Sequence, residues 1–280
     1  MSAEPVEVFL IFAHEDEVQL SALIKRLLPY GGRDKAIVHI DAKSRLWKTT
    51  RGAFLKDIPN VCLIENPVPV YWAHSSMLEA IALLIKKAVK EEFALAHLIS
   101  GSDWPVKDKA DRLKDWDGLS LIEAERNVQS ERMARYWLDA RFARYRAIGL
   151  YHWRLKEAID WVGRLIPPRL DEPWGAWHKG ASWWSLTSAA CSHILPALDQ
   201  AFQTKRLFAT LCADEHLIQT ILANQMPDTI RRDSKRATFW TGNSSSPRVL
   251  TAQDWPSIKS SGAWFARKVS RHVDPFFLQL

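Results

Sequence analysis

The chain contains few cysteines, and none of them lies in a recognisable motif. Cys62, Cys191 and Cys212 are an odd number in 280 residues, with no Cys-x-x-Cys pair and no Cys/His spacing typical of zinc sites. Cysteines used in this way are usually reduced and buried in an intracellular protein. We therefore expect neither disulfides nor redox chemistry.

Long apolar runs are also absent. The run at 8–13 is far shorter than the roughly 20 residues that a membrane-spanning helix needs, and the N-terminus has neither the basic start nor the cleavage site of a signal peptide. We expect a soluble, cytoplasmic protein without a membrane anchor, peripheral at most to the inner membrane.

What the chain does contain is an ordinary globular composition with an excess of tryptophan. Hydrophobic residues make up 47% of the chain and charged residues 25%, and a chain of this length and composition can bury a sizeable core. The net charge of +6 suits an anionic partner, but it does not distinguish nucleic acid, a membrane surface and a nucleotide-sugar diphosphate. Fourteen tryptophans supply flat aromatic faces on which sugar rings and nucleobases pack, and this favours a glycan ligand.

Alternating apolar and amphipathic segments predict an α/β fold. An apolar run at 6–13 precedes a polar loop and an amphipathic stretch at 18–28, which is the pattern of a strand, a loop and a helix. Units of this kind build a mainly parallel or mixed sheet flanked by helices. Further strands are expected at 36–40, 61–64, 94–99 and 182–186, and further helices at 75–89, 108–114 and 188–202.

Three polar positions follow the predicted strands directly. His14, Asp41 and Asp103 lie at or just beyond the carboxyl ends of the first, second and fourth of them. Ligands of such sheets bind beyond the carboxyl ends of the strands. We therefore expect these three loops to converge on one crevice.

The segment at about 126–172 has a different composition, rich in Arg, Trp and Tyr. Apolar residues at helical spacing predict a basic amphipathic insertion, and with no repeat or linker to divide the chain we expect one domain over 1–280 that carries it. A solvated face is the ordinary role of such arginines. The alternative is peripheral contact with an anionic membrane or a charged acceptor, because basic helices with Trp settle at interfaces. The residues concerned are Trp153, Ile159, Val162 and Ile166, with Arg126, Arg132, Arg135, Arg141, Arg144, Arg146 and Arg154.

Two adjacent carboxylates, Asp214 and Glu215, precede an apolar stretch that predicts a helix. A carboxylate can take the proton from a hydroxyl group and make it a nucleophile. The same residues at a helix start can instead cap the helix or face its dipole. The pattern alone leaves both roles open.

Eight short segments together resemble the core-2/I-branching glycosyltransferase family, whose known branches are β-1,6-N-acetylglucosaminyltransferases and peptide O-xylosyltransferases. Each segment is weak alone, but all eight follow the order of the family. Only 126–172 is poorly matched, and the chain is shorter than the Golgi members and lacks their N-terminal anchor. The segments are IFAH at 11–14, VHIDAK at 38–43, VYWAHSS at 70–76, LISGSDWPV at 98–106, KGASWWSLT at 179–187, DEH at 214–216, PRVLT at 247–251 and FARK at 265–268.

The resemblance implies a GT-A-like fold and an inverting transferase that moves GlcNAc or xylose from a UDP-sugar to a hydroxyl of a glycan or glycoconjugate, with no cofactor and no required metal. Glu215 is similar to the base, and Arg248 and Lys268 to the cations that clamp the diphosphate. The remaining donor positions are His14, Asp41, Lys43, Trp72, Ser100, Gly101 and Asp103. The acceptor or sugar contacts are Ser182, Trp183, Trp184, Asp214 and Trp240, with two of the four tryptophans expected to touch ligand.

Metal-binding patterns are weak. Metal-dependent relatives of the implied fold use an Asp-x-Asp at a strand end, whereas Asp115-Trp116-Asp117 follows a charged helix and is expected to be a helix end or turn. His39 shares a strand with Asp41, but a buried core histidine is its ordinary state. Arg248 and Lys268 would then replace a metal ion by offsetting the charge of the departing diphosphate.

Two other classes remain open at this point. A basic single-stranded nucleic-acid binder would interleave cations with aromatics, but here the cations crowd into 126–172 and no RNA-binding signature is present, so we expect no nucleic-acid partner. A catalytically silent glycan-binding module would bind oligosaccharide without binding UDP.

Overall fold

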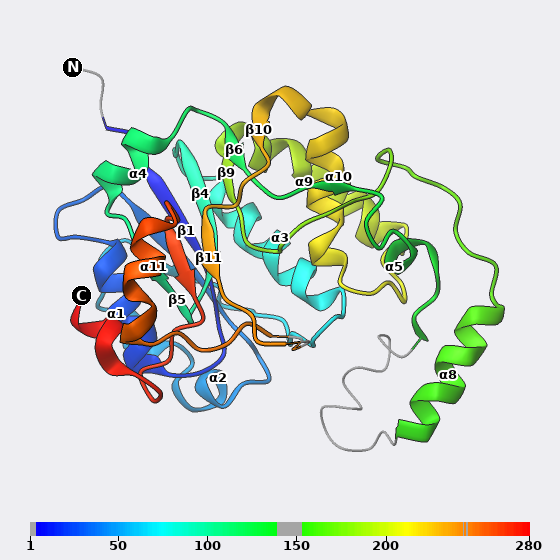
Figure 1. Cartoon of the computed structure of the whole chain (residues 1–280), viewed down its shortest axis with the longest axis horizontal. Helices are drawn as coiled ribbons and strands as arrows, with labels where there is room; N and C mark the ends of the chain where they lie inside the picture. Colours follow the sequence, from blue (N-terminus) through cyan, green and yellow to red (C-terminus); the bar gives the residue numbers. More distant parts are fainter. Residues whose placement is uncertain (1–3, 139–152, 243, 245) are drawn as a thin grey trace.

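The protein is described by a computed structural model that covers residues 4–138, 153–242, 244 and 246–280. Its centre is a seven-stranded sheet with the strand order β10-β6-β9-β4-β1-β2-β3, flanked by helices (Figure 1). The strands β4, β1, β2 and β3 are parallel, and β9 runs antiparallel to both β4 and β6. The predicted α/β class with a mainly parallel sheet is confirmed. The strands are β1 (Glu7–Ala13), β2 (Lys35–Ile40), β3 (Val61–Leu63), β4 (Leu95–Ser100), β6 (Ser120–Leu121), β9 (Ser185–Thr187) and β10 (Ile230–Arg231).

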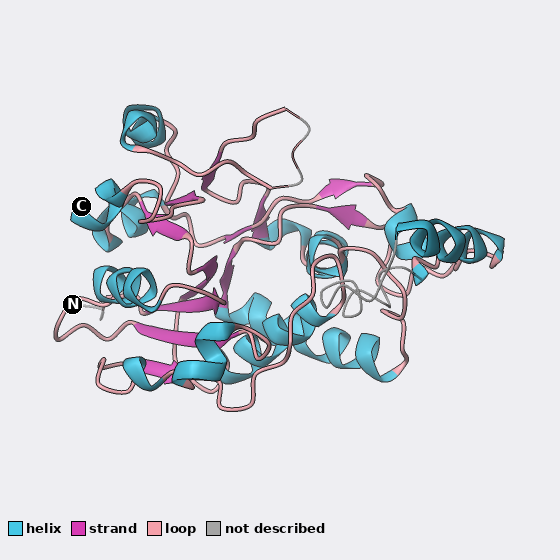
Figure 2. Cartoon of the chain, turned by 90° about the horizontal axis from the view of Figure 1, so that it is seen from below, coloured by secondary structure: helices cyan, strands magenta, loops and turns pink. Residues whose placement is uncertain are grey.

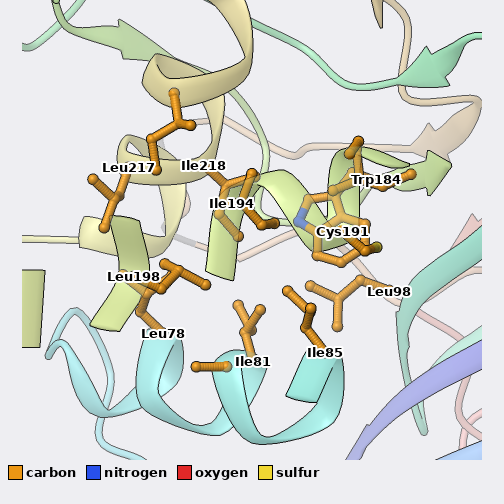
Figure 3. Close-up of a cluster of buried hydrophobic side chains, with 14 of the residues drawn as sticks. Leu78, Ile81, Ile85, Leu98, Trp184, Cys191, Ile194, Leu198, Leu217 and Ile218 are labelled. Atoms are coloured by element: carbon orange, nitrogen blue, oxygen red, sulfur yellow. The ribbon is translucent and has the colours of Figure 1, made fainter. Parts of the chain in front are cut away.

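The central strand β1 divides the interior into two cores. All seven of its residues are buried, as expected of a strand covered on both faces. Val8, Leu10 and Phe12 face one core, and Phe9 and Ile11 face the other, because successive side chains of a strand point to opposite faces. The helices α3 (Ser76–Ala88), α9 (Ser188–Gln203) and α10 (Leu217–Gln225) build the first core, part of which is drawn in Figure 3. The helix α1 (Glu17–Leu27) and the C-terminal segments build the second.

Two smaller sheets complete the fold, and Figure 2 shows the strands against the surrounding helices. In the three-stranded sheet β11-β12-β5, the antiparallel pairing of β12 with β5 places Arg267 opposite Asp103. Its strands are β11 (Arg236–Thr238), β12 (Phe265–Arg267) and β5 (Asp103–Pro105), and the two-stranded sheet pairs β7 (Glu125–Arg126) with β8 (His178–Lys179). The other helices are α2 (Arg45–Thr50), α4 (Lys109–Asp115), α5 (Glu131–Ala134), α8 (Trp153–Leu165) and α11 (Trp255–Ser260), with 3-10 helices at Ala53–Leu55, Ala213–Glu215, Pro227–Thr229, Ala252–Asp254 and Pro275–Gln279.

The predicted elements agree with the structure except around residues 182 and 214. The strand expected at 182–186 is confined to Ser185–Thr187, which leaves Ser182 and Trp183 in a loop. Asp214 and Glu215 do not open the helix α10; they lie in a 3-10 turn just before it. Cys212 begins this turn with a left-handed backbone conformation, φ 51°, and so redirects the chain. The Asp-x-Asp string lies at the end of α4 and in the following turn, as expected.

The helical insertion is only partly described. Its described elements are α5 and α8, whereas Arg141, Arg144 and Arg146 lie outside the described residues, as do the side chains of Trp153 and Arg154. Within the ranges that are described, no helix has both the length and the apolar character that a bilayer crossing requires.

Candidate active site

A cavity of about 930 Å³ lies between segments that are far apart in the sequence. One wall is the loop that contains Tyr71 and Trp72, and another is the loop at 179–183 with the 3-10 turn Ala213–Glu215. The third comes from β11, β12 and the loop between them. Its charged lining residues are Glu123, Lys179, Asp214, Glu215, Arg236, Arg267 and Lys268.

The two carboxylates of the 3-10 turn have different surroundings. Glu215 keeps 32% of its side chain exposed, and its Oε2 accepts a hydrogen bond of 2.8 Å from Nη1 of Arg132, with Nζ of Lys179 at 3.9 Å. Asp214 accepts a hydrogen bond of 2.6 Å from Oγ of Ser182. Burial raises the pKa of Asp214 to about 6, because the gain from the Ser182 hydrogen bond is smaller than the desolvation cost and the Glu215 charge adds to that cost. Glu215 is therefore the more accessible carboxylate.

Gly180 allows the loop at 179–183 to lie close to its neighbours. Its amide donates a hydrogen bond of 2.9 Å to the carbonyl oxygen of Glu215, which ties the loop to the 3-10 turn. A Cβ atom at this position would lie 1.9 Å from the carbonyl oxygen of Glu123. Only glycine fits this close approach.

Arg267 is the most buried cation on the cavity wall that β11, β12 and the loop between them form. Only 6% of the residue is exposed, its guanidinium lies 3.8 Å from the ring centroid of Trp183, and its Nε is 3.6 Å from Oδ1 of Asp103. Burial lowers the pKa of Arg267, and the Asp103 carboxylate opposes that effect. Among the described residues its Nε and Nη1 have no hydrogen-bond partner. Buried N–H groups that lack partners are costly, so this wall is suited to an anion.

Lys268 and Arg236 extend the cationic wall. Nζ of Lys268 donates a hydrogen bond of 2.5 Å to Oγ of Ser246, and burial together with the charge of Arg267 lowers the pKa of Lys268. Arg236 donates hydrogen bonds to the carbonyl oxygens of Ser234 at 2.6 Å and Trp184 at 2.8 Å. Burial lowers its pKa to about 9, so Arg236 remains charged at neutral pH.

The structure brings seven of the fifteen predicted site residues to the cavity. Glu215, Asp214 and Ser182 line it on one side and Lys268 on another, with Trp72, Trp183 and Trp240. Trp72 and Trp240 are 69% and 57% exposed, which leaves both rings accessible to a ligand. The described residues that line the cavity do not include the other eight, namely His14, Asp41, Lys43, Ser100, Gly101, Asp103, Trp184 and Arg248.

Asp41 and Asp103 support the cavity wall from behind. Oδ1 of Asp41 accepts hydrogen bonds from the amides of Lys43 and Val70, and Nζ of Lys43, paired with Asp41, lies 5.4 Å from the Tyr71 ring. These contacts position the loop that carries Tyr71 and Trp72. The predicted convergence of the strand-end side chains on one crevice is therefore wrong for Asp41, because its carboxylate faces backbone amides.

The remaining polar positions after β1 and β4 also turn away from the cavity. Asp103 is fully buried and accepts hydrogen bonds from the amide and hydroxyl of Ser100, besides facing Arg267. Gly101 donates its amide to the carbonyl oxygen of Phe12, 2.7 Å away. The His14 side chain is 63% exposed, with Nε2 3.5 Å from Glu15. None of these four residues lines the cavity, and their role as donor contacts stays a prediction.

Two further predicted contacts, Trp184 and Arg248, do not line the cavity. Trp184 is fully buried in the core beside α3 and α9, so it cannot stack on a sugar, whereas its neighbour Trp183 faces the cavity. Arg248 pairs with Asp254 through both Nη atoms, at 2.8 Å and 2.5 Å, and lies over the ring of Phe239. Its guanidinium is therefore already neutralised within the protein.

Sequence reasoning missed Arg267, Arg236, Lys179 and Arg132. A signal for Arg267 was present, because an arginine inside the apolar stretch at 263–269 is unusual for a buried strand and marks a polar partner or a ligand. Arg236 and Arg132 carried no such signal, since each lies in a polar segment, whereas Lys179 opens the segment KGASWWSLT and could have been found there.

The histidine expected in the core is there. His39 is fully buried, and its Nε2 accepts a hydrogen bond of 3.0 Å from the amide of Val68. Burial lowers the pKa of His39 to about 4, so the ring is neutral at pH 7. Across the described ranges no group of three or more His, Cys, Asp or Glu side chains is arranged to hold a metal ion.

Comparisons with known proteins identify a family. The family described as Core-2/I-Branching enzyme matches residues 8–259. A search of curated proteins found no match. Among solved structures the chain is similar to the apo structure of WbbM, a bifunctional glycosyltransferase, with a TM-score of 0.41 and 12% sequence identity over 95% of this chain. This chain spans 46% of the length of that one.

Asp214→Asn tests the buried carboxyl of the 3-10 turn. The pKa of Asp214 in the folded state, about 6, exceeds its ordinary value of 3.8, so the native state binds this proton more tightly than the unfolded state does. The stability that the bound proton contributes is lost as pH rises through 6. We expect the variant to exceed the wild type in free energy of unfolding by about 1–3 kcal/mol at pH 7.5 and to match it near pH 4, as measured by urea denaturation. The exposed control Asp57→Asn should show no such trend, and a pH-independent difference would contradict the assignment.

Proposed function

The chain belongs to the Core-2/I-Branching enzyme family of glycosyltransferases, and we propose that it transfers GlcNAc or xylose from a UDP-sugar to a hydroxyl of a glycan or glycoconjugate acceptor. We further propose inversion at the anomeric carbon and catalysis without a bound metal ion. The observation that carries this proposal is one cavity lined by an accessible carboxylate, Glu215, and by two cations from another segment, the buried Arg267 and the half-buried Lys268.

Arg267 and Lys268 are the groups best placed to receive the diphosphate. A UDP leaving group takes the electron pair of the broken bond, and fixed cations in a water-poor site stabilise that charge strongly. Nε and Nη1 of Arg267, which have no hydrogen-bond partner among the residues that the structure describes, could be satisfied by phosphate oxygens, and the ammonium of Lys268 would add a second positive charge. This assignment replaces Arg248, which Asp254 already engages.

Glu215 is the base in this mechanism. The acceptor oxygen attacks the anomeric carbon, its proton passes to the Glu215 carboxylate, and the bond between the anomeric carbon and the UDP oxygen breaks with its electrons going to the diphosphate. Arg132 and Lys179 hold the carboxylate in place without closing it off, since 32% of the side chain stays exposed. Trp72 and Trp240 offer faces for the sugar rings.

Glu215→Gln tests the base. We expect kcat for sugar transfer to fall at least about 100-fold, since general base catalysis contributes roughly 10²–10⁴. The dissociation constant for UDP, measured by calorimetry, should change less than about twofold, because the amide keeps the size of the side chain. Glu125→Gln, a nearby exposed carboxylate, serves as the control and should keep wild-type turnover. Undiminished transfer by Glu215→Gln would remove Glu215 from this role.

Arg267→Gln tests the cationic wall. Loss of charged hydrogen bonds worth about 1.5–3 kcal/mol should weaken UDP binding by roughly 10- to 100-fold, while the affinity for uridine changes little. Arg248→Gln should weaken UDP binding less than about threefold. A thermal melting curve establishes that each variant folds. Lys268→Gln tests the other cation of the same wall by the same UDP-binding measurement. A larger loss in Arg248→Gln than in Arg267→Gln would reverse the assignment.

Removal of divalent metal tests the role given to the cations. We expect the transfer rate to be unchanged after dialysis against EDTA, because Arg267 and Lys268 supply the positive charge that a metal ion would otherwise provide. A rate that falls at least about tenfold and recovers on addition of Mn²⁺ or Mg²⁺ would contradict metal independence.

A further inference from the structure

The segment 42–56 gathers positive charge on the outside of the fold. It contains five Lys and Arg and no Asp or Glu, and all of it belongs to the described part of the chain. It includes the helix α2 and the 3-10 helix Ala53–Leu55, and Figure 1 shows α2 at the outer edge of the molecule. The five cations are all exposed, namely Lys43, Arg45, Lys48, Arg51 and Lys56.

Most of this charge is not neutralised by the protein. Lys43 pairs with Asp41, but among the described residues no carboxylate forms an ion pair with any of the other four cations. Arg45 and Lys48 are three residues apart, as are Lys48 and Arg51, so consecutive members lie next to each other on the helix surface. We call Arg45, Lys48 and Arg51 the cationic row. Its charge is available to an anionic partner.

The large apolar side chains of the same segment face inward. Leu46, Trp47 and Leu55 are 7%, 7% and 2% exposed, and Phe54 packs against the same core. The guanidinium of Arg51 lies 5.4 Å from the centroid of the Trp47 ring, which keeps it close to the helix. A basic surface without exposed large apolar side chains has nothing to insert into a bilayer. The cationic row therefore suits a soluble polyanion better than a membrane.

Lys43 joins the cationic row to the wall of the active-site cavity. Its Nζ lies 5.4 Å from the ring centroid of Tyr71, and Tyr71 lines the cavity together with Trp72, which is 69% exposed. Asp41, which pairs with Lys43, also accepts a hydrogen bond of 3.1 Å from a backbone amide of the loop that carries Tyr71. The loop and the start of α2 are thus held together. A sugar chain that leaves the cavity past Trp72 has the cationic row beside it.

We propose that the acceptor is an acidic glycan and that the cationic row binds the part of it that lies outside the cavity. This inference rests on the proposed function, because it assigns a substrate class to the transferase. The anionic groups are carboxylates of uronic acids or phosphates, since Arg and Lys pair with both. Exposed ion pairs are individually weak, so the row contributes affinity and orientation of the acceptor and takes no part in the chemical step.

Calorimetry with defined oligosaccharides tests the proposal. In the presence of UDP, the wild type should bind a galacturonic acid oligosaccharide of about six sugars at least about threefold more tightly than its methyl ester, which has the same backbone without the charge. A phosphorylated maltooligosaccharide is compared with its neutral parent in the same way, and the acidic probe that binds identifies the anionic group. High salt should weaken this binding several-fold, because the cations are exposed.

A double variant tests the cationic row itself. Arg45→Gln with Lys48→Gln should weaken binding of the acidic oligosaccharide by roughly three- to thirtyfold, the range for two exposed ion pairs, and leave binding of its neutral counterpart unchanged. The matched control is Lys25→Gln with Arg26→Gln, which removes the same charge from two exposed cations at the end of α1. This control should bind the acidic oligosaccharide like the wild type.

UDP binding separates failure of this inference from failure of the proposed function. Both double variants should keep the UDP affinity of the wild type, since none of the four substituted residues lines the cavity. If UDP binds but the wild type does not prefer either acidic oligosaccharide to its neutral form, the acidic acceptor is wrong and the transferase assignment stands. A loss below threefold in the α2 variant, an equal loss in the control, or tighter binding of a single-stranded RNA of the same length would also overturn the inference. Absence of UDP binding would remove the proposed function and this inference together.

Discussion

A buried arginine held between an aromatic ring and a buried carboxylate is the constraint on which the cavity depends. Removing a guanidinium from water is costly, and the cost is tolerable only when nearby groups compensate it. Arg267 has the Trp183 ring on one side and Asp103 near its Nε. Asp103 is in turn fixed by Ser100. The Arg267 side chain is thus set in one place, with part of its hydrogen-bonding capacity left for a ligand.

The fold supplies this arrangement by pairing strands that are distant in the chain. β5 follows β4 of the large sheet, and β12 lies near the C-terminus, yet the two pair antiparallel and bring Arg267 opposite Asp103. The carboxylates reach the same cavity from a 3-10 turn that leads into α10. Gly180 joins that turn to the loop carrying Ser182 and Trp183. Base and cations therefore come from separately supported elements: Glu215 pairs with Arg132, whereas Arg267 and Lys268 reach the same cavity from β12 and the residue after it.

The sequence predicted the large elements well because their patterns are long. β1, β2, β4, α1 and α3 lie within two residues of the expected ranges, since buried runs and helical spacing extend over six or more residues. The strands β5, β11 and β12 have three residues each, too few for alternation to appear, and their pairing depends on contacts distant in the chain.

The candidate site was predictable in part for similar reasons. Glu215 and Lys268 were found through short motifs, and both line the cavity. The direction of a side chain was not available from those motifs. Asp41 and Trp184 occupy the expected places in the chain, but one faces backbone amides and the other the core. Arg248 and Arg267 are both arginines near Lys268 in the sequence. Only the structure shows that Arg248 pairs with Asp254, whereas two N–H groups of Arg267 have no partner in the described part of the chain.

The central claim is that one cavity holds the donor diphosphate against Arg267 and Lys268 and presents the sugar to Glu215. A crystal structure of the protein with UDP tests this most directly. The account predicts phosphate oxygens within hydrogen-bond distance of Nη1 of Arg267 and Nζ of Lys268, with the terminal phosphate directed toward the Glu215 carboxylate. UDP bound without contact to either cation, or with its terminal phosphate directed away from Glu215, would contradict it.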